Sequence, residues 1–188
     1  MGNLTQFQRS LIIGSVLGDG YVRTIPGRKD AFLEVNHAYE QKAYVDWKYR
    51  KLENIVASKP KQRAGNGERT AYRFFTRQLS DISELQNRFY DNGKKMIPND
   101  LELDPVIIAI WYMDDGSACR KDDVYFNTQQ FSKQCQNQLL QSLSDKGIEG
   151  HLNKDKQYNR IRLLKSSIPK LKEMISAHVI PSMEYKLR

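Results

Sequence analysis

Two stretches decide the fold of this 188-residue chain: Ile12-Ile13-Gly14-Ser15-Val16-Leu17-Gly18-Asp19-Gly20 and Ile108-Ala109-Ile110-Trp111-Tyr112-Met113-Asp114-Asp115-Gly116. Each is an apolar helical segment that delivers a carboxylate at its C-terminal end, where glycine lets the chain leave the helix. The two acids, Asp19 and Asp115, are 96 residues apart, about half of the chain. We interpret the chain as one structural unit used twice, with each copy giving one carboxylate to a shared site.

The placement of these two acids predicts a bound cation. A carboxylate at the C-terminal end of a helix is disfavoured, because that end carries partial negative charge. A divalent cation held by Asp19 and Asp115 would remove the penalty, and oxygen ligands suit Mg²⁺ or Ca²⁺. The sequence therefore predicts a metal site built from one acid of each repeat.

A second pair of similar phrases supports the duplication. Lys94-Lys95-Met96-Ile97-Pro98 follows the first unit and Val179-Ile180-Pro181 follows the second. We therefore predict two repeats, residues 1–98 and 99–188, each with the order helix, strand pair, helix, strand pair, helix. The helices are expected at 4–19, 39–56, 79–90, 105–115, 132–145 and 167–178, and the strand pairs at 21–25 with 31–37, 59–63 with 70–77, 117–121 with 124–128, and 149–154 with 158–164.

The composition favours a polyanionic partner. Thirty lysine and arginine residues against 22 acidic ones give a formal net charge of +8, and such a basic protein usually meets nucleic acid. No apolar stretch approaches the roughly 18 residues of a membrane span, and no secretory signal is visible. Cys119 and Cys135 lack metal-ligand spacing and indicate reduced thiols. These features favour an intracellular protein, and mitochondrial, plastid and prokaryotic origins all fit.

Five ordered phrases carry a family resemblance. Besides the two helix ends and the Lys94 phrase, they are Asn127-Thr128-Gln129 and Ile180-Pro181 with Tyr185-Lys186-Leu187. Together they resemble the LAGLIDADG homing endonucleases and their maturase relatives, in the single-chain type that carries two motifs. The family name LAGLIDADG contains two acids, and the second is the catalytic one. The first acid is replaced in this chain by Leu17 in one motif and by Met113 in the other.

The resemblance implies an α+β fold. Its expected form is a pseudo-twofold pair of αββαββα units, with paired motif helices at the centre and two antiparallel β-saddles that bind DNA. It implies a monomer that cuts double-stranded DNA at a long target site, which need not be palindromic because the fused halves can differ. It also implies cleavage with Mg²⁺ that leaves short 3′ overhangs, with Mn²⁺ able to substitute and Ca²⁺ supporting binding without efficient cleavage.

The resemblance also assigns roles to residues at the predicted site. Metal ligation falls to Asp19 and Asp115, with backbone oxygens of Gly18 and Asp114 completing part of the shell. Each of two lysines would polarise water or stabilise the transition state, and three further side chains are candidates for ordering the water network. The lysines are Lys95 and Lys186, and the others are Gln129, His37 and Asn153.

Polar residues of the predicted strands are the candidates for reading DNA. Arginine suits guanine and asparagine suits adenine, because each offers a bidentate pair of hydrogen bonds. A solvated strand face is the alternative for each. The candidates are Tyr21, Arg23, Arg28, Glu34, Asn36, Lys61, Arg63, Arg69, Arg73, Arg120, Tyr125, Asn127, His151, Asn153, Arg160 and Arg162.

Two other functions remain open at this stage. One is an RNA maturase that helps a host group I intron to splice, and the other is a DNA-binding relative without catalysis. The presence of both acids and both lysines favours the nuclease, since neither alternative needs to keep them.

Overall fold

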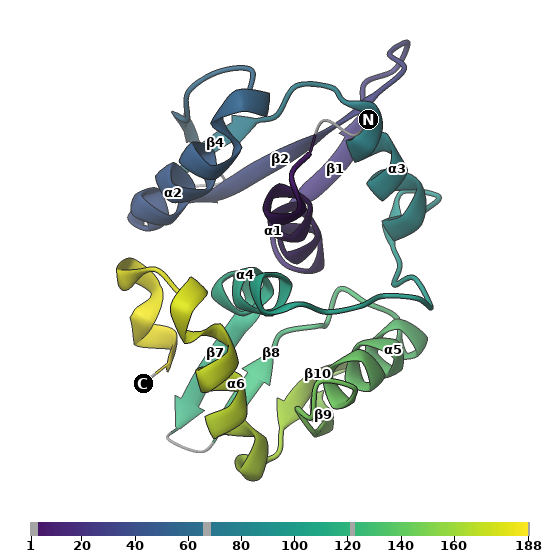
Figure 1. The fold of residues 1–188 in the computed structure, drawn as a ribbon, viewed down its shortest axis with the longest axis vertical. Helices are drawn as coiled ribbons and strands as arrows, with labels where there is room; N and C mark the ends of the chain where they lie inside the picture. The colour runs from purple at the N-terminus through teal and green to yellow at the C-terminus, as the bar shows by residue number, and fades with distance from the viewer. Residues whose placement is uncertain (1–3, 66–68, 121–122, 188) are drawn as a thin grey trace. The chain divides into compact units, whose positions relative to one another are not determined.

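A computed structural model describes residues 4–65, 69–120 and 123–187. The chain divides into two compact units, Met1–Asn87 and Arg88–Arg188 (Figure 1). The division lies 11 residues before the predicted end of the first repeat, so that Lys95 and Ile97 belong to the second compact unit.

The first unit follows the predicted order of elements. Its sheet has the strand order β1-β2-β4-β3, and all neighbouring strands are antiparallel. The helices α1 and α2 pack against this sheet. The elements are α1 (Gln6–Leu17), β1 (Tyr21–Thr24), β2 (Ala31–Ala38), α2 (Lys42–Leu52), β3 (Lys61–Ala64), β4 (Thr70–Phe75) and α3 (Ser80–Phe89), with 3₁₀ turns at Tyr39–Gln41 and Glu53–Ile55.

The second unit has the same order after a short additional hairpin. Its sheet is β7-β8-β10-β9, again antiparallel throughout, and α5 packs on β9 and β10. The elements are β5 (Tyr90–Asp91), β6 (Lys94–Lys95), α4 (Pro105–Asp115), β7 (Gly116–Arg120), β8 (Asp123–Phe126), α5 (Lys133–Ser144), β9 (Gly150–Asp155), β10 (Tyr158–Leu163) and α6 (Ile168–Ile175), with 3₁₀ turns at Lys165–Ser167, Ser176–His178 and Pro181–Leu187.

These elements confirm the predicted α+β class and αββαββα order of each unit. The predictions were less accurate at the ends of elements. The predicted helices 39–56 and 167–178 are shorter α-helices flanked by 3₁₀ turns, and the short strands β5 and β6 were not predicted. Lys121 of the strand predicted at 117–121 lies outside the described residues, as do Asn66 and Gly67, which connect the strands predicted at 59–63 and 70–77.

Local sequence explains where the two motif helices begin. Thr5 caps α1 through a capping box, in which its hydroxyl accepts from the Gln8 N–H and the Gln8 side chain accepts from the Thr5 N–H. Asp104 caps α4 by accepting from the Ile107 N–H at 2.8 Å, and Pro105 occupies the first helical position, where its missing N–H costs nothing.

Glycine is required where each motif helix passes into its first strand. A Cβ on Gly20 would lie 2.7 Å from the backbone oxygen of Ser15, and one on Gly116 would lie 2.4 Å from the backbone oxygen of Tyr112. Both distances are shorter than real Cβ contacts. The glycine after each acid therefore permits a close turn, and this turn fixes the acid at the junction of helix and strand.

The cores of both units are apolar, and the described helices are short. Along β2, Leu33 and Val35 are buried while Glu34 and Asn36 on the other face are more exposed, as expected for a half-buried strand.

Among the described residues, no helix combines the length and apolarity that a bilayer crossing requires.

Candidate active site and DNA-binding faces

Asp19 lies in the turn between α1 and β1. Gly18 ends the helix, with its N–H donating to the backbone oxygens of Gly14 and Ser15 at 3.1 Å each. The side chain of Asp19 is 48% exposed. An accessible carboxylate at the negative end of a helix is suited to a bound cation.

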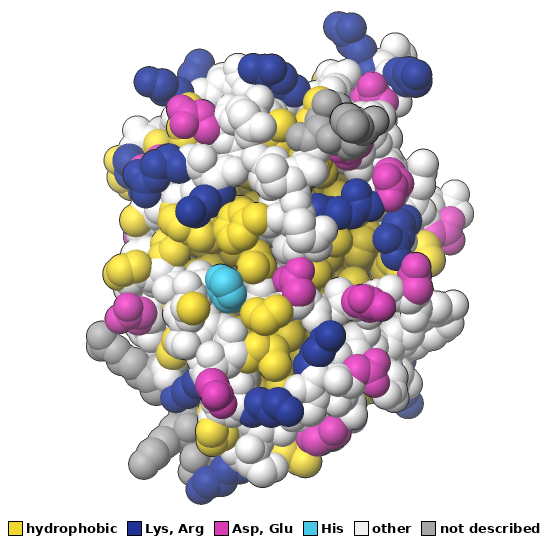
Figure 2. Space-filling model, in the orientation of Figure 1, with side chains coloured by type: hydrophobic (Ala, Val, Ile, Leu, Met, Phe, Trp, Pro, Cys, Tyr) yellow, Lys and Arg dark blue, Asp and Glu magenta, His cyan; other side chains and the backbone are white. Residues whose placement is uncertain are grey.

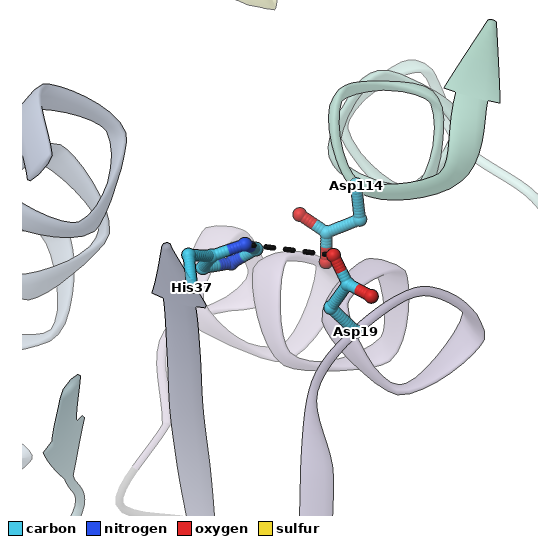
Figure 3. A group of neighbouring side chains, drawn as sticks. All are labelled: Asp19, His37 and Asp114. Atoms are coloured by element: carbon cyan, nitrogen blue, oxygen red, sulfur yellow. Dashed lines mark ion pairs between the residues drawn. The ribbon is translucent and has the colours of Figure 1, made fainter. Parts of the chain in front are cut away.

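His37 lies beside Asp19 on β2. Its Nδ1 is 3.5 Å from Asp19 Oδ2, and its side chain is 3% exposed (Figure 3). The buried face behind it is aromatic: the His37 and Tyr44 rings are 5.3 Å apart, and Tyr44 stacks on Trp47 at 6.1 Å. The ammonium of fully buried Lys48 lies 4.5 Å from the Tyr44 ring centroid. This packing holds the imidazole in a defined position against the carboxylate.

Asp115 ends α4 and is held by polar neighbours from the next turn. Its Oδ2 accepts from Gln130 Nε2 at 3.1 Å. Its backbone oxygen accepts from the Asn127 N–H at 3.0 Å and from Asn127 Nδ2 at 2.8 Å. The contact from the Gln130 side chain was not predicted from the sequence, where only Gln129 was a candidate.

Lys186 caps the C-terminal end of α4. Its Nζ donates to the backbone oxygens of Met113 at 2.6 Å and Asp114 at 3.0 Å. In return, the Tyr112 hydroxyl donates to the Lys186 backbone oxygen at 2.8 Å. A cation at this end of a helix is favourable, so the predicted catalytic lysine reaches the helix end that carries Asp115. The predicted metal ligand Asp114 is buried here, and its backbone oxygen accepts from this ammonium.

The buried hydroxyl of Tyr112 predicts a dependence of stability on alkaline pH. Burial raises the pKa of Tyr112 to about 12, compared with about 10 in an unfolded chain. The folded state therefore retains this proton more strongly, and the stabilisation is complete below pH 10 and is lost as the pH rises to 12. We expect urea unfolding midpoints to fall less steeply over this range in Tyr112→Phe than in the wild type. Parallel curves would contradict this assignment.

The remaining predicted catalytic side chains are distributed differently. Lys95 is half-buried in β6, where it pairs with Tyr90, and its exposed neighbour Lys94 pairs with Asp91. Gln129 donates through Nε2 to Asp155 Oδ2 at 2.9 Å, whereas Gln130 contacts Asp115. Asn153 is half-buried on β9 and donates to the Lys154 backbone oxygen at 3.2 Å.

The first sheet gathers most of its predicted DNA-reading residues on one face. Glu34 forms ion pairs with Arg23 at 3.3 Å and with Arg73 at 3.4 Å. Strand pairing places Lys61 opposite Arg73, on the same face. Tyr21, Asn36 and Arg63 are exposed on the strands, and Arg28 and Arg69 are exposed in the connections.

The second sheet holds two guanidinium groups near one aromatic ring. The Cζ atoms of Arg160 and Arg162 lie 3.9 and 5.9 Å from the Tyr125 ring centroid, and Arg162 forms an ion pair with Asp123. Arg160 also donates to Asn127 Oδ1 at 3.5 Å. Such contacts orient an arginine before it meets a ligand.

Two further candidates lie on the flanking strands of the second sheet. His151 is exposed on β9, and strand pairing places it opposite Arg162. Arg120 ends β7, and its side chain lies outside the described part of the chain. Figure 2 shows lysine and arginine side chains across one side of the molecule, with acidic side chains among them.

Comparison with known proteins identifies the family of this chain. Residues 9–171 match the LAGLIDADG DNA endonuclease family, and the chain therefore belongs to it. The cytochrome b mRNA maturase bI2 of Debaryomyces hansenii is 30% identical over 190 residues, which cover 94% of this chain and 72% of the maturase.

Two other similarities extend over nearly the whole chain. The RecA protein of Mycobacterium gastri is 32% identical over 205 residues, covering 98% of this chain but only 48% of that RecA. The structure of the homing endonuclease I-WcaI bound to its DNA recognition sequence matches with a TM-score of 0.92 and 25% identity, covering 100% of this chain and 88% of that one.

Proposed function

We propose that this protein is a site-specific endonuclease that cuts both strands of a long, asymmetric DNA target as a monomer. The observation that carries the proposal is the repeated junction at Asp19-Gly20 and Asp115-Gly116. In each unit an acid and a glycine connect the end of a helix to the first strand of an arginine-bearing sheet. The family membership of residues 9–171 supports this function, as does the fold match to I-WcaI with its DNA.

A divalent cation fits the donor atoms at these junctions. Each junction offers a carboxylate, Asp19 in the first unit and Asp115 in the second, and the Gly18 backbone oxygen is a further proposed donor. The Asp114 backbone oxygen, which accepts from Lys186 Nζ at 3.0 Å, would have to bind the cation through its second lone pair. Oxygen donors of this kind suit Mg²⁺ or Mn²⁺. A bound cation supplies positive charge that stabilises the phosphate transition state. We expect Mg²⁺ and Mn²⁺ to support cleavage, whereas Ca²⁺ supports binding only, because its looser geometry positions the reacting groups poorly.

The protein groups around the acids would orient water and offset developing charge. His37 fixes one oxygen of Asp19, and Gln130 fixes one oxygen of Asp115. Lys186 brings an ammonium to the end of α4, and Lys95 is its proposed counterpart for the other DNA strand. Hydrolysis in this arrangement would break one phosphodiester in each strand and leave short 3′ overhangs.

Selection of cleaved sites from a randomised DNA library in Mg²⁺ tests the proposed function. The expected result is one long consensus sequence whose two halves differ, cut in both strands. A library that stays uncut in both Mg²⁺ and Mn²⁺, with duplex DNA still bound, would support a DNA-binding relative without catalysis.

A role as an RNA maturase is the second candidate. Its support is the 30% identity to the Debaryomyces hansenii maturase over 94% of this chain. The nuclease remains the preferred function because both acids and both lysines are present. Splicing of a group I intron RNA that depends on the protein, without any DNA cleavage, would favour the maturase instead.

The two lysines are expected to serve different DNA strands. Lys95→Met should slow cutting of one strand and Lys186→Met the other, each by about 10²–10³, as for loss of one preorganised electrostatic group. Nicking of an end-labelled duplex measures each strand separately. Lys94→Met is the matched control, since Lys94 is the exposed neighbour of Lys95. Equal slowing of both strands by either change would contradict the assignment of one lysine to each strand.

A further inference from the structure

The outer face of the first sheet carries an aromatic pair among its charged residues. Phe32 alternates with Leu33 along β2 and so belongs to the face of Glu34, yet it is only 6% exposed. It is covered by Phe75 of β4, at 5.7 Å between ring centroids, and by Arg23, whose Cζ lies 5.2 Å from its ring. Two phenylalanines therefore stand on a face that is otherwise suited to a polyanion.

A hollow of about 520 Å³ opens beside this aromatic pair. The two rings, Ile25 and Ala57 supply apolar surface, and polar side chains supply the rest. The lining residues that matter here are Arg23, Ile25, Phe32, Phe75, Arg77 and Gln78. The hollow therefore combines an apolar wall with two guanidinium groups, a chemistry that suits an apolar group attached to a polyanion.

Duplex DNA carries one such group in the major groove. The C5-methyl of thymine is the apolar feature of the groove, and phenylalanine is among the side chains that contact it. Accepting the proposed function, we propose that the hollow beside Phe32 and Phe75 reads the methyl group of a thymine in the DNA target, with Arg23 and Arg77 beside the adjoining DNA backbone.

The position of the hollow along the sheet predicts where this thymine lies. β1 starts two residues after Asp19, and strand pairing places Arg23 opposite Phe32. Four to six residues of extended chain from Asp19 span roughly 13–20 Å. This length corresponds to roughly four to six base pairs at 3.4 Å each. The thymine should therefore lie about that far from the cut, in the half of the target that the first unit reads.

Deoxyuridine substitution tests this inference on the selected target, because deoxyuridine lacks only the methyl group. Each thymine of the half-site is replaced in turn, and the dissociation constant is measured in Ca²⁺ with the full-length protein. One thymine at the predicted distance should weaken binding about threefold to tenfold when it loses its methyl, the effect expected for one buried methyl group. Absence of thymine from that region, or no sensitive thymine there, would overturn the inference.

A variant at the hollow links this effect to the protein. In Phe75→Ala the thymine-bearing target should bind more weakly, and deoxyuridine should cause no further loss, because the two changes remove the same contact. Phe7→Ala is the matched control, because Phe7 is also half-buried and aromatic but packs against Trp47 of α2 and does not line the hollow. This variant should keep the full sensitivity. Sensitivity that persists in Phe75→Ala would overturn the inference while leaving the endonuclease function intact. Failure of the protein to bind any duplex would overturn both.

Discussion

Asp19→Asn and Asp115→Asn are each expected to abolish double-strand cleavage of the target, while DNA affinity stays within about tenfold, or roughly 1.4 kcal/mol. Asparagine keeps the shape of the side chain but removes the charge that would hold a divalent cation. Because the proposal assigns one carboxylate of each unit to the same double-strand cut, loss of either acid should be sufficient. The measurement is the yield of linear product from a plasmid that carries the selected site, in Mg²⁺ and in Mn²⁺.

The structure supplies a control for this experiment. Asp100→Asn removes a carboxylate of the second unit that is 79% exposed and pairs with Arg88 at 2.8 Å. It should cut at the wild-type rate, which shows that loss of one surface charge is not the cause. Full double-strand cutting by Asp19→Asn or by Asp115→Asn would refute the assignment of the acids.

The local pattern of each unit could be predicted from the sequence because its causes are local. Gly20 and Gly116 are required by close approaches to backbone atoms four or five residues earlier, and such turns leave a glycine in the sequence. Alternation of apolar and polar residues likewise identified β10, where Ile161 and Leu163 are buried and Arg162 lies on the other face. These signals do not depend on distant parts of the chain.

Contacts between distant residues could not be predicted in the same way. Gln129 and Gln130 are adjacent and chemically identical, and only the path of the turn after β8 directs Gln130 to Asp115 and Gln129 to Asp155. The cap on α4 comes from Lys186, about 70 residues away in sequence. Alternation along Phe32-Leu33-Glu34-Val35-Asn36 is imperfect, so the sequence alone does not show which face of this strand points inward. The pairing of β2 with β1 and β4 places Phe32 on the same face as Glu34.

The strong positive charge predicts a steep dependence of DNA binding on salt. The net charge is +8, and both sheets present lysine or arginine on their outer faces. A protein that contacts 6–10 phosphates loses about 10³–10⁵ in affinity between 50 and 200 mM salt, because bound counterions are released from the DNA. We expect a loss of this size for the selected duplex, measured by titration in Ca²⁺ so that the DNA stays uncut.

Variants that remove charge from β3 test whether this sheet contacts the DNA phosphates. Replacing exposed Lys61 and Arg63 of β3 by glutamine should lower the slope of log affinity against log salt by about two, one for each charge. Arg9→Gln should leave the slope unchanged, since Arg9 lies on α1 and pairs with Glu84 at 2.5 Å.

The same titration with a folded group I intron RNA separates the two candidate functions. A nuclease binds its duplex far more tightly than the RNA at every salt concentration, whereas a nearly flat salt dependence on duplex DNA together with tight RNA binding would identify the RNA as the partner.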